Sequence, residues 1–217
     1  MNKTIIIAEA GVNHNGDIEI AKKLIDVASD ADADYVKFQT FKADRLVSPL
    51  AQKAKYQIKN ETSNDDSQLN MLKKLELSDA DHKELISYCK SKNINFFSTA
   101  FDDEGISYLS SLNFDMFKIP SGELTNYPYL KAIAKTGLPV ILSSGMANLD
   151  EIEKSINVLI SHGTKKSEIT VLHCNTEYPT PMSDVNLKAM LHIKKNLGVT
   201  IGYSDHTLGI EVPIAAV

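Results

Sequence analysis

The chain contains 217 residues, of which 43% are hydrophobic and 24% are charged, and its formal net charge is -5. This composition is typical of a globular protein with a sizeable core, and it excludes a disordered or fibrous chain. The negative net charge and the lack of a dense basic stretch exclude nucleic acid as a partner.

Strands and helices alternate along the first half of the chain. Asp17 and Ser78 are suitable N-caps, and apolar residues at helical spacing follow each of them. The segment from Phe41 to Asp66 holds no clear element, and a loop of that length in a compact domain is usually functional or disordered. We predict strands at Thr4–Glu9, Tyr35–Gln39 and Asn95–Thr99, and helices at Asp17–Ser29, Asp79–Lys92 and Asp102–Ser111.

The alternation becomes more regular in the second half. Gly137, Gly163 and Gly198 follow three predicted helices, where a left-handed residue commonly ends the helix. The predicted strands are Met116–Ile119, Pro139–Leu142, Ile169–His173 and Val199–Tyr203, and the predicted helices are Tyr127–Thr136, Leu149–Ser161 and Asn186–Asn196. Strands that alternate with helices pair in parallel, which gives either an open doubly wound sheet or a (β/α)8 barrel.

Polar side chains capable of chemistry follow the carboxyl ends of all seven predicted strands. In a (β/α)8 barrel these ends converge on one face, whereas an open sheet concentrates function at one switch point. The pattern therefore favours a (β/α)8 TIM barrel, incomplete in this chain, in one domain over residues 1–217. The polar side chains at or just after the strand ends include Glu9, Lys37, Gln39, Ser98, Thr99, Lys118, Ser121, Glu123, Ser143, Ser144, His173, Tyr178, Ser204, Asp205 and His206.

Two lysines stand out among these residues. Lys37 and Lys118 each lie between apolar neighbours, so strand alternation points them into the barrel, where a buried lysine is costly without an anionic partner. Glu9 is ambiguous, because it could serve as their structural counter-ion. Serine, aspartate and asparagine at strand ends also have a plainer interpretation as helix caps.

Two short glycine-containing turns run toward helices. The hydroxyls and backbone N–H groups of Ser121-Gly122 and Ser143-Ser144-Gly145 are suited to hold a phosphate at a helix N-terminus. Together with two inward lysines, these turns indicate a phosphorylated, carboxylated substrate.

The cellular location follows from weaker signals. Cys89 and Cys174 lie far apart and match no zinc pattern, which favours a reducing cytoplasm. The N-terminal apolar run is followed at once by Glu9, so it is too short for a signal peptide or a membrane span. We expect a cytoplasmic protein with no membrane partner.

Six sequence runs in order along the chain resemble the N-acetylneuraminate (sialic acid) synthase family, which includes the legionaminic and pseudaminic acid synthases. The resemblance covers nearly the whole chain, and several of the runs are long. The six runs are Ile7–Gly16 (IAEAGVNHNG), Val36–Thr40 (VKFQT), Phe117–Glu123 (FKIPSGE), Leu142–Met146 (LSSGM), His173–Pro181 (HCNTEYPTP) and Gly202–Thr207 (GYSDHT).

The resemblance implies an enzyme that condenses phosphoenolpyruvate with an open-chain N-acetylated amino sugar. The acceptor would be N-acetylmannosamine or a related 6-deoxy diacetamido hexose, and the products a nine-carbon 2-keto acid and phosphate. It also implies a divalent metal cofactor, manganese in first place and magnesium or cobalt as alternatives. The metal would polarise the sugar aldehyde as a Lewis acid.

The same resemblance assigns roles to individual residues. Glu123 would be the base that activates water, Lys118 a catalytic contact to phosphoenolpyruvate, and His206 a catalytic metal ligand. The other contacts to phosphoenolpyruvate would be Lys37, Thr99, Ser121, Ser143, Ser144 and Ser204. The contacts to the sugar would be Gln39, Asn60, Glu123 and Tyr178.

This chain departs from the family pattern at several points. Asn15 stands where some members have glutamate, and Ala100 where proline is expected. The sequence as given ends at Val217, inside the expected seventh helix. The resemblance implies an eighth strand with a second metal histidine, and a small antifreeze-like domain that donates an arginine across a homodimer; neither lies within these residues.

Two other functions remain open at the level of the sequence. One is a barrel aldolase or lyase in which Lys37 or Lys118 forms a Schiff base with a carbonyl substrate. The other is a fragment that binds ligand or partner without turnover. The identity of the acceptor sugar is also open.

Overall fold

The computed structural model describes residues 3–53 and 67–217, and Asn60, which was assigned to the sugar, lies outside these residues. The chain divides into two compact units, residues 1–105 and 106–217. All pairs between the named strands are parallel, as the alternation of strands and helices predicted.

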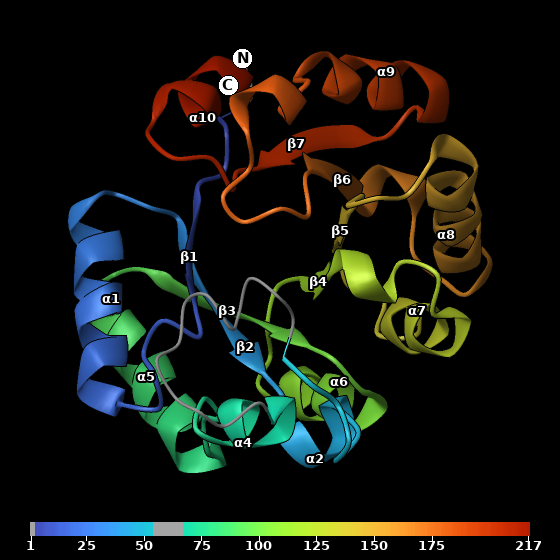
Figure 1. Cartoon of the computed structure of the whole chain (residues 1–217). Coiled ribbons are helices and arrows are strands. Elements are labelled where there is room, and N and C mark those ends of the chain that lie inside the picture. The colour runs from blue at the N-terminus through green and yellow to red at the C-terminus, as the bar shows by residue number, and fades with distance from the viewer. Residues whose placement is uncertain (1–2, 54–66) are drawn as a thin grey trace. The chain divides into compact units, whose positions relative to one another are not determined.

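The first unit contains a parallel sheet in the order β1-β2-β3 (Figure 1). Its strands are β1 (Ile7–Gly11), β2 (Tyr35–Thr40) and β3 (Asn95–Ala100). Its helices are α1 (Ile18–Asp30), α2 (Ala43–Leu46), α4 (Gln68–Lys73) and α5 (Asp79–Ser91), and α6 (Asp103–Ser111) begins at the end of this unit.

The core of the first unit lies between the sheet and helices α1 and α5, which run side by side (Figure 1). Val36 and Phe38 of β2 are fully buried, as are Ile25 of α1 and Leu85 of α5. Successive side chains of a strand point to opposite faces. The intervening residues Lys37 and Gln39 therefore belong to the face away from these apolar side chains.

Local sequence signals set the ends of α1 and α5. The side chain of Asp17 accepts hydrogen bonds from the backbone N–H groups of Glu19 and Ile20, and Ser78 forms a capping box with Asp81. Both predicted N-caps are therefore confirmed. Beyond their other ends, Asp32 and Asn93 adopt left-handed backbone conformations, with φ of 55° and 57°. Short polar side chains tolerate this conformation.

The second unit contains a parallel sheet in the order β4-β5-β6-β7. Its strands are β4 (Phe117–Ile119), β5 (Val140–Ser143), β6 (Ile169–Cys174) and β7 (Thr200–Ser204). Its other helices are α7 (Tyr127–Ala134), α8 (Leu149–Ser161), α9 (Lys188–Leu197) and α10 (Glu211–Ala216), with single 3-10 turns at Ser121–Glu123, Lys166–Glu168 and Met182–Asp184.

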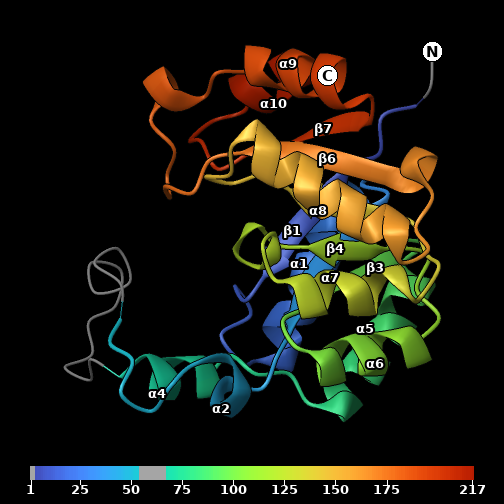
Figure 2. The same cartoon turned by 90° about the vertical axis from the view of Figure 1, so that its right-hand side faces the viewer.

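Apolar strand residues form the centre of the second unit. Ile119, Leu142 and Val171 from three successive strands are fully buried. Helices α7 and α8 lie side by side, and Ile133 and Leu159 are buried on them (Figure 2). Beyond α9, Gly198 takes the left-handed conformation predicted for it, with φ of 61°.

Two predictions about individual elements are wrong. The segment from Phe41 to Asp66 does hold an element, the one-turn helix α2, which is too short to show apolar periodicity. The helix predicted from Asn186 begins at Lys188, because Asn186 itself has a positive φ of 41°.

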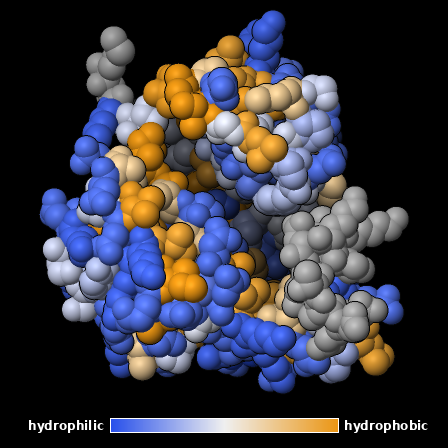
Figure 3. Space-filling view, turned by 60° about the vertical axis from the view of Figure 1, so that its left-hand side comes forward, coloured by the Kyte–Doolittle hydropathy of each residue, from blue (hydrophilic) through white to orange (hydrophobic). Residues whose placement is uncertain are grey.

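Apolar side chains reach the surface at several places among hydrophilic ones, as Figure 3 shows for one face. Around α10, Leu208, Ile210 and Ile214 are exposed, and Val212 is the buried residue of this helix. Among the described helices, none is long and apolar enough to span a membrane.

Two buried histidines, His14 and His82, lie within the first unit. Burial lowers the pKa of His14 below its ordinary value of 6.5, and His82 nearby lowers it further against an opposing effect of Asp81. Burial is likewise the largest cause that lowers the pKa of His82, although the Ser78 carbonyl, Asp79 and Asp81 oppose it. Both imidazoles are therefore neutral in the folded protein at neutral pH.

These histidines should make the stability of the protein fall on mild acidification. The pKa of both histidines is lower in the folded state, so on acidification the unfolded chain binds more protons than the folded protein. The free energy of unfolding therefore decreases as the pH decreases. Urea denaturation at pH 7.5 and pH 5.5 measures this loss. His82→Gln should reduce it, whereas His192→Gln, at an exposed position on α9, should not. An equal loss in all three proteins would contradict the prediction.

Candidate active site

Lys37 in the middle of β2 pairs with Glu9 of β1. The two residues face each other in the register of the parallel strands, and Lys37 Nζ lies 2.5 Å from Glu9 Oε2. The lysine side chain is 12% exposed and the glutamate side chain 51% exposed. The structure therefore resolves the ambiguity about Glu9, which is the counter-ion of Lys37.

A bulge after Glu9 shapes the end of β1. The register shifts between Glu9 and Gly11, and Gly11 has a positive φ of 54°. A Cβ atom at Gly11 would lie 3.2 Å from Glu9 Oε1 and 3.9 Å from Gln39 Nε2. Bulges of this kind re-aim side chains at the rims of barrels and beside active sites. The Glu9 carboxylate and the Gln39 amide therefore border the same backbone turn.

Thr99 completes the polar group of the first unit. It is the register partner of Gln39 across β2 and β3. Its side chain is buried, and its hydroxyl has no hydrogen-bond partner among the described residues. Buried polar groups are normally satisfied in native proteins. Thr99 is therefore a candidate for a hydrogen bond to a ligand.

Lys118 in the middle of β4 is the centre of the polar group in the second unit. Its side chain is buried, and its Nζ donates to Ser143 Oγ at 2.7 Å and to the backbone oxygen of Ile119 at 3.0 Å. These two hydrogen bonds fix the ammonium in a buried position. A buried and fixed ammonium is suited to bind an anion.

The turn after β5 packs against Ser121. Gly145 has a φ of 51°, and its N–H donates to Cys174 Sγ at 3.3 Å. A Cβ atom at Gly145 would lie 2.5 Å from the Ser121 Cβ atom, so a larger residue would not fit. Ser144, immediately before Gly145, is buried. Ser143 and Ser144 thus precede this turn directly, and Ser121 packs against it. Ser143 is also the hydrogen-bond partner of Lys118.

Glu123 lies in the 3-10 turn that follows β4. Its Oε2 accepts a hydrogen bond from Asn126 Nδ2 at 2.6 Å. Asn126 is the N-cap of α7, because its Oδ1 accepts from the backbone N–H of Tyr129. The glutamate is thus held in place by the start of a helix.

Tyr178 and His206 lie together after β6 and β7. Their ring centroids are 4.4 Å apart, and the Thr180 N–H donates to the backbone oxygen of His206 at 2.8 Å. Ser204, at the end of β7, is the register partner of Cys174. Tyr203 beside it has its pKa raised to about 12, mainly by burial.

The described residues do not by themselves fit a metal centre. Among residues 3–53 and 67–217, no group of three or more His, Cys, Asp or Glu side chains is placed to hold a metal ion. His206 offers an imidazole, but the nearby Asp205 carboxylate accepts bonds from the N–H and the hydroxyl of Thr207. A divalent ion needs several ligands in a fixed geometry. The metal with His206 as a ligand stays a prediction, and no chemical step below depends on it.

Two residues of the site were missed in the sequence. Asn126 carries the signal of a helix N-cap, but nothing in the sequence indicates that its amide also holds Glu123. Cys174 was considered only for zinc and redox chemistry, whereas its sulfur accepts the Gly145 N–H. These contacts were not predictable, because they depend on how loops after different strands meet.

Comparison with known proteins gives a consistent result. Residues 24–217 match the model of the NeuB family. The N,N'-diacetyllegionaminic acid synthase of Campylobacter jejuni is 58% identical over all of this chain and 65% of its own length. The enzyme of the same name from Legionella pneumophila is 49% identical over 98% of this chain and 60% of its own length.

A solved structure extends the likeness to the fold. The N-acetylneuraminic acid (sialic acid) synthetase of Leptospira borgpetersenii superimposes with a TM-score of 0.84 at 35% identity, over 99% of this chain and 69% of that protein. This likeness confirms the predicted fold class, an incomplete (β/α)8 barrel. The chain spans between 60% and 65% of the length of the two curated relatives.

Proposed function

Because the chain belongs to the NeuB family, we propose that it forms the catalytic barrel of a sialic-acid-type synthase. In this reaction, C3 of phosphoenolpyruvate attacks the aldehyde carbon of an open-chain N-acetylated amino sugar and forms a carbon–carbon bond. The aldehyde oxygen takes a proton and becomes a hydroxyl. Water then adds to C2 and loses one proton. The new C2 hydroxyl loses its remaining proton as the bond from C2 to the phosphate oxygen breaks, so that C2 becomes a carbonyl and the phosphate leaves as hydrogen phosphate. The products are the 2-keto acid and inorganic phosphate.

The observation that carries this proposal is the Lys118 group. Phosphoenolpyruvate is an anion with a phosphate and a carboxylate, and the second unit offers a buried ammonium bonded to Ser143, next to which Ser144 follows in the chain. Hydroxyls and an ammonium fixed in a buried position stabilise anionic groups without further reorganisation. Lys118, Ser121, Ser143, Ser144 and Ser204 are therefore our candidates for binding phosphoenolpyruvate.

The first unit supplies complementary chemistry. Lys37 carries a second positive charge, and the Thr99 hydroxyl lacks a hydrogen-bond partner among the described residues. We assign both to phosphoenolpyruvate and assign the Gln39 amide to the sugar, whose hydroxyl and amide groups it can recognise. Asn60 has the same proposed role, and Tyr178 would contact the sugar from the second unit.

Glu123 is our candidate for the base. Addition of water to C2 releases a proton, and a carboxylate placed at the site can accept it. Asn126 holds one carboxylate oxygen of Glu123, so the side chain has a fixed orientation. His206 is our candidate for a metal ligand.

The acceptor that we favour is a 6-deoxy diacetamido hexose. Two relatives at 58% and 49% identity carry the name of N,N'-diacetyllegionaminic acid synthase. The second candidate is N-acetylmannosamine, because the sialic acid synthetase structure shares the fold at 35% identity. A homodimer and a cytoplasmic location stay predictions.

The activity can be tested with the complete gene product that contains this chain. Phosphate release should require phosphoenolpyruvate and the amino sugar, and mass spectrometry should find the nine-carbon keto acid. The diacetamido sugar should give a higher kcat/KM than N-acetylmannosamine. Phosphate release at the same rate without any sugar would contradict the proposed function, and a preference for N-acetylmannosamine would contradict the acceptor assignment.

A further inference from the structure

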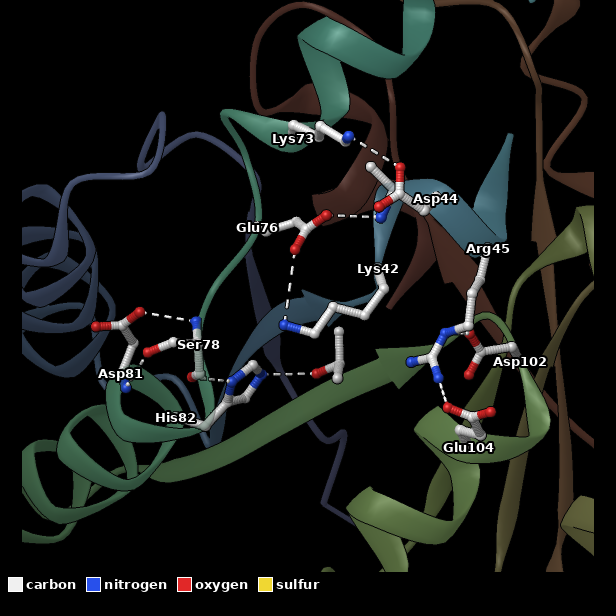
Figure 4. Close-up of polar contacts among 12 residues, drawn as sticks. Lys42, Asp44, Arg45, Lys73, Glu76, Ser78, Asp81, His82, Asp102 and Glu104 are labelled. Atoms are coloured by element: carbon white, nitrogen blue, oxygen red, sulfur yellow. Dashed lines mark hydrogen bonds and ion pairs between the residues drawn. The ribbon is translucent and has the colours of Figure 1, made fainter. Parts of the chain in front are cut away.

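A chain of buried polar side chains lies on the core side of β2 and β3. Thr40 Oγ1 is 2.8 Å from His82 Nε2 and 2.6 Å from Ser98 Oγ. His82 and Ser98 are each 1% exposed. The other imidazole nitrogen, Nδ1, lies 2.9 Å from the backbone oxygen of Ser78 (Figure 4). The chain thus connects two strands to the first turn of α5.

The direction of every hydrogen bond in this chain can be deduced. The Ser78 carbonyl oxygen only accepts, so His82 Nδ1 carries the hydrogen. In a neutral imidazole the other nitrogen, Nε2, then accepts, and the Thr40 hydroxyl must donate to it. Thr40 has one hydrogen, so the Ser98 hydroxyl donates to Thr40. Each hydrogen in the chain thus has one acceptor, and only one arrangement of these hydrogens satisfies the three contacts.

This chain lies directly behind two residues of the proposed site. Thr40 follows Gln39 and Ser98 precedes Thr99, and neighbouring side chains of a strand point to opposite faces. Gln39 and Thr99 are also register partners. A shift of Thr40 or Ser98 along its strand would therefore displace the adjacent substrate contact.

A second contact anchors the same end of β2. Glu76, two residues before Ser78, accepts a hydrogen bond from the Ala43 N–H at 2.7 Å and pairs with Lys42 at 3.6 Å (Figure 4). The segment from Glu76 to His82 therefore holds the chain at Thr40 and again at Ala43. Two fixed points define the direction in which β2 ends.

We propose that His82 is a positioning residue, which acts through Thr40 and Ser98 to align Gln39 and Thr99 for their substrates. The proposal rests on the proposed function. The Phe96 ring borders the chain, with its centroid 6.2 Å from that of His82. Apolar side chains could fill this space, but hydrogen-bonded polar side chains select one geometry. Its purpose is therefore alignment rather than stability alone.

Kinetics of variants in the complete gene product test this role. Thr40→Val removes the hydroxyl at nearly constant volume, and we expect kcat/KM to fall about tenfold or more, because small misplacements at a site cost large factors in rate. Thr40→Ser keeps the hydroxyl and should recover most of the rate. His82→Leu should resemble Thr40→Val, whereas His82→Gln, which can again present an acceptor to Thr40, should be less affected.

Thr136→Val is the matched control. Thr136 follows α7 in the second unit, and its half-buried hydroxyl donates to the backbone oxygen of Ile133 at 2.7 Å. It should lower stability with kcat/KM unchanged. If Thr40→Val loses stability but keeps the parent kcat/KM, the chain is merely structural and the proposal is wrong. A parent protein without synthase activity would instead contradict the proposed function, and the positioning role with it.

Nitrogen-15 NMR supplies a measurement that does not depend on turnover. His82 should show the tautomer with hydrogen on Nδ1, and its signals should shift in Thr40→Val. The tautomer is measured in the parent protein, so this test also serves if a variant at His82 fails to fold. Hydrogen on Nε2 in the parent would overturn the deduced chain and the proposal.

Discussion

Replacement of Lys118 by alanine should weaken the binding of phosphoenolpyruvate by about a hundredfold or more. The Lys118 ammonium is buried, and its Nζ donates to the Ser143 hydroxyl and to the Ile119 carbonyl. Truncation of one member of a buried charged contact costs roughly 2–5 kcal/mol, and each 1.4 kcal/mol is about a tenfold change in affinity. The KM for phosphoenolpyruvate and a direct titration of the ligand would measure the loss.

The control for this variant is Lys154→Ala. Lys154 lies exposed on α8, so its replacement removes the same charge away from the proposed site. It should leave the affinity within about twofold, because exposed charges are screened by water and salt. An unchanged affinity in Lys118→Ala would remove Lys118 from the site.

The same residue separates the synthase from the Schiff-base alternative. To form a Schiff base, Lys118 Nζ would have to give up its hydrogen bonds to the Ser143 hydroxyl and the Ile119 carbonyl. Treatment with pyruvate and borohydride should therefore leave the mass of the protein unchanged. A mass increase located at Lys118 or Lys37 would instead support an aldolase.

Glu123→Gln should lower kcat by about a hundredfold or more with little change in either KM. General base catalysis contributes roughly 10²–10⁴ to a rate, and glutamine cannot take the proton from water. The amide has nearly the same shape, and its oxygen can still accept from Asn126 Nδ2. Steady-state kinetics with both substrates would separate kcat from KM. Lost turnover with binding intact is the signature of an interaction made mainly in the transition state.

Asn126→Ala provides the companion variant. It leaves the carboxylate but releases it from the N-cap of α7, so we expect a smaller fall in kcat than in Glu123→Gln. The helix also loses its cap, at a cost of about 1 kcal/mol. Should Glu123→Gln react at the parent rate, another group accepts the proton and Glu123 is not the base.

The sequence alone predicted much of each unit. The alternation of Val36 and Phe38 with Lys37 and Gln39 distinguished the buried face of β2 from its other face. Asp17 and Ser78 marked the starts of two helices, and both cap them. These features are local, because side-chain periodicity and capping depend on residues within a few positions of one another.

Contacts between distant segments required the tertiary structure. Glu9 became the partner of Lys37 through the register of β1 and β2, and Asn126 became the holder of Glu123 through the course of the loop after β4. Thr40 and His82 are 42 positions apart in the chain. The hydrogen bond between them cannot be predicted from the residue types, since threonine and histidine also occur in cores without such a bond.

The sequence by itself determined the succession of strands and helices, the buried faces and the residue types at the strand ends. Only the tertiary structure decided which of these side chains contact one another. The physical reason is that a hydrogen bond or ion pair requires atoms within about 3 Å. That precision comes from strand register and from the packing of helices on the sheet. Lys118 and Ser143 meet in this way, although 25 positions separate them.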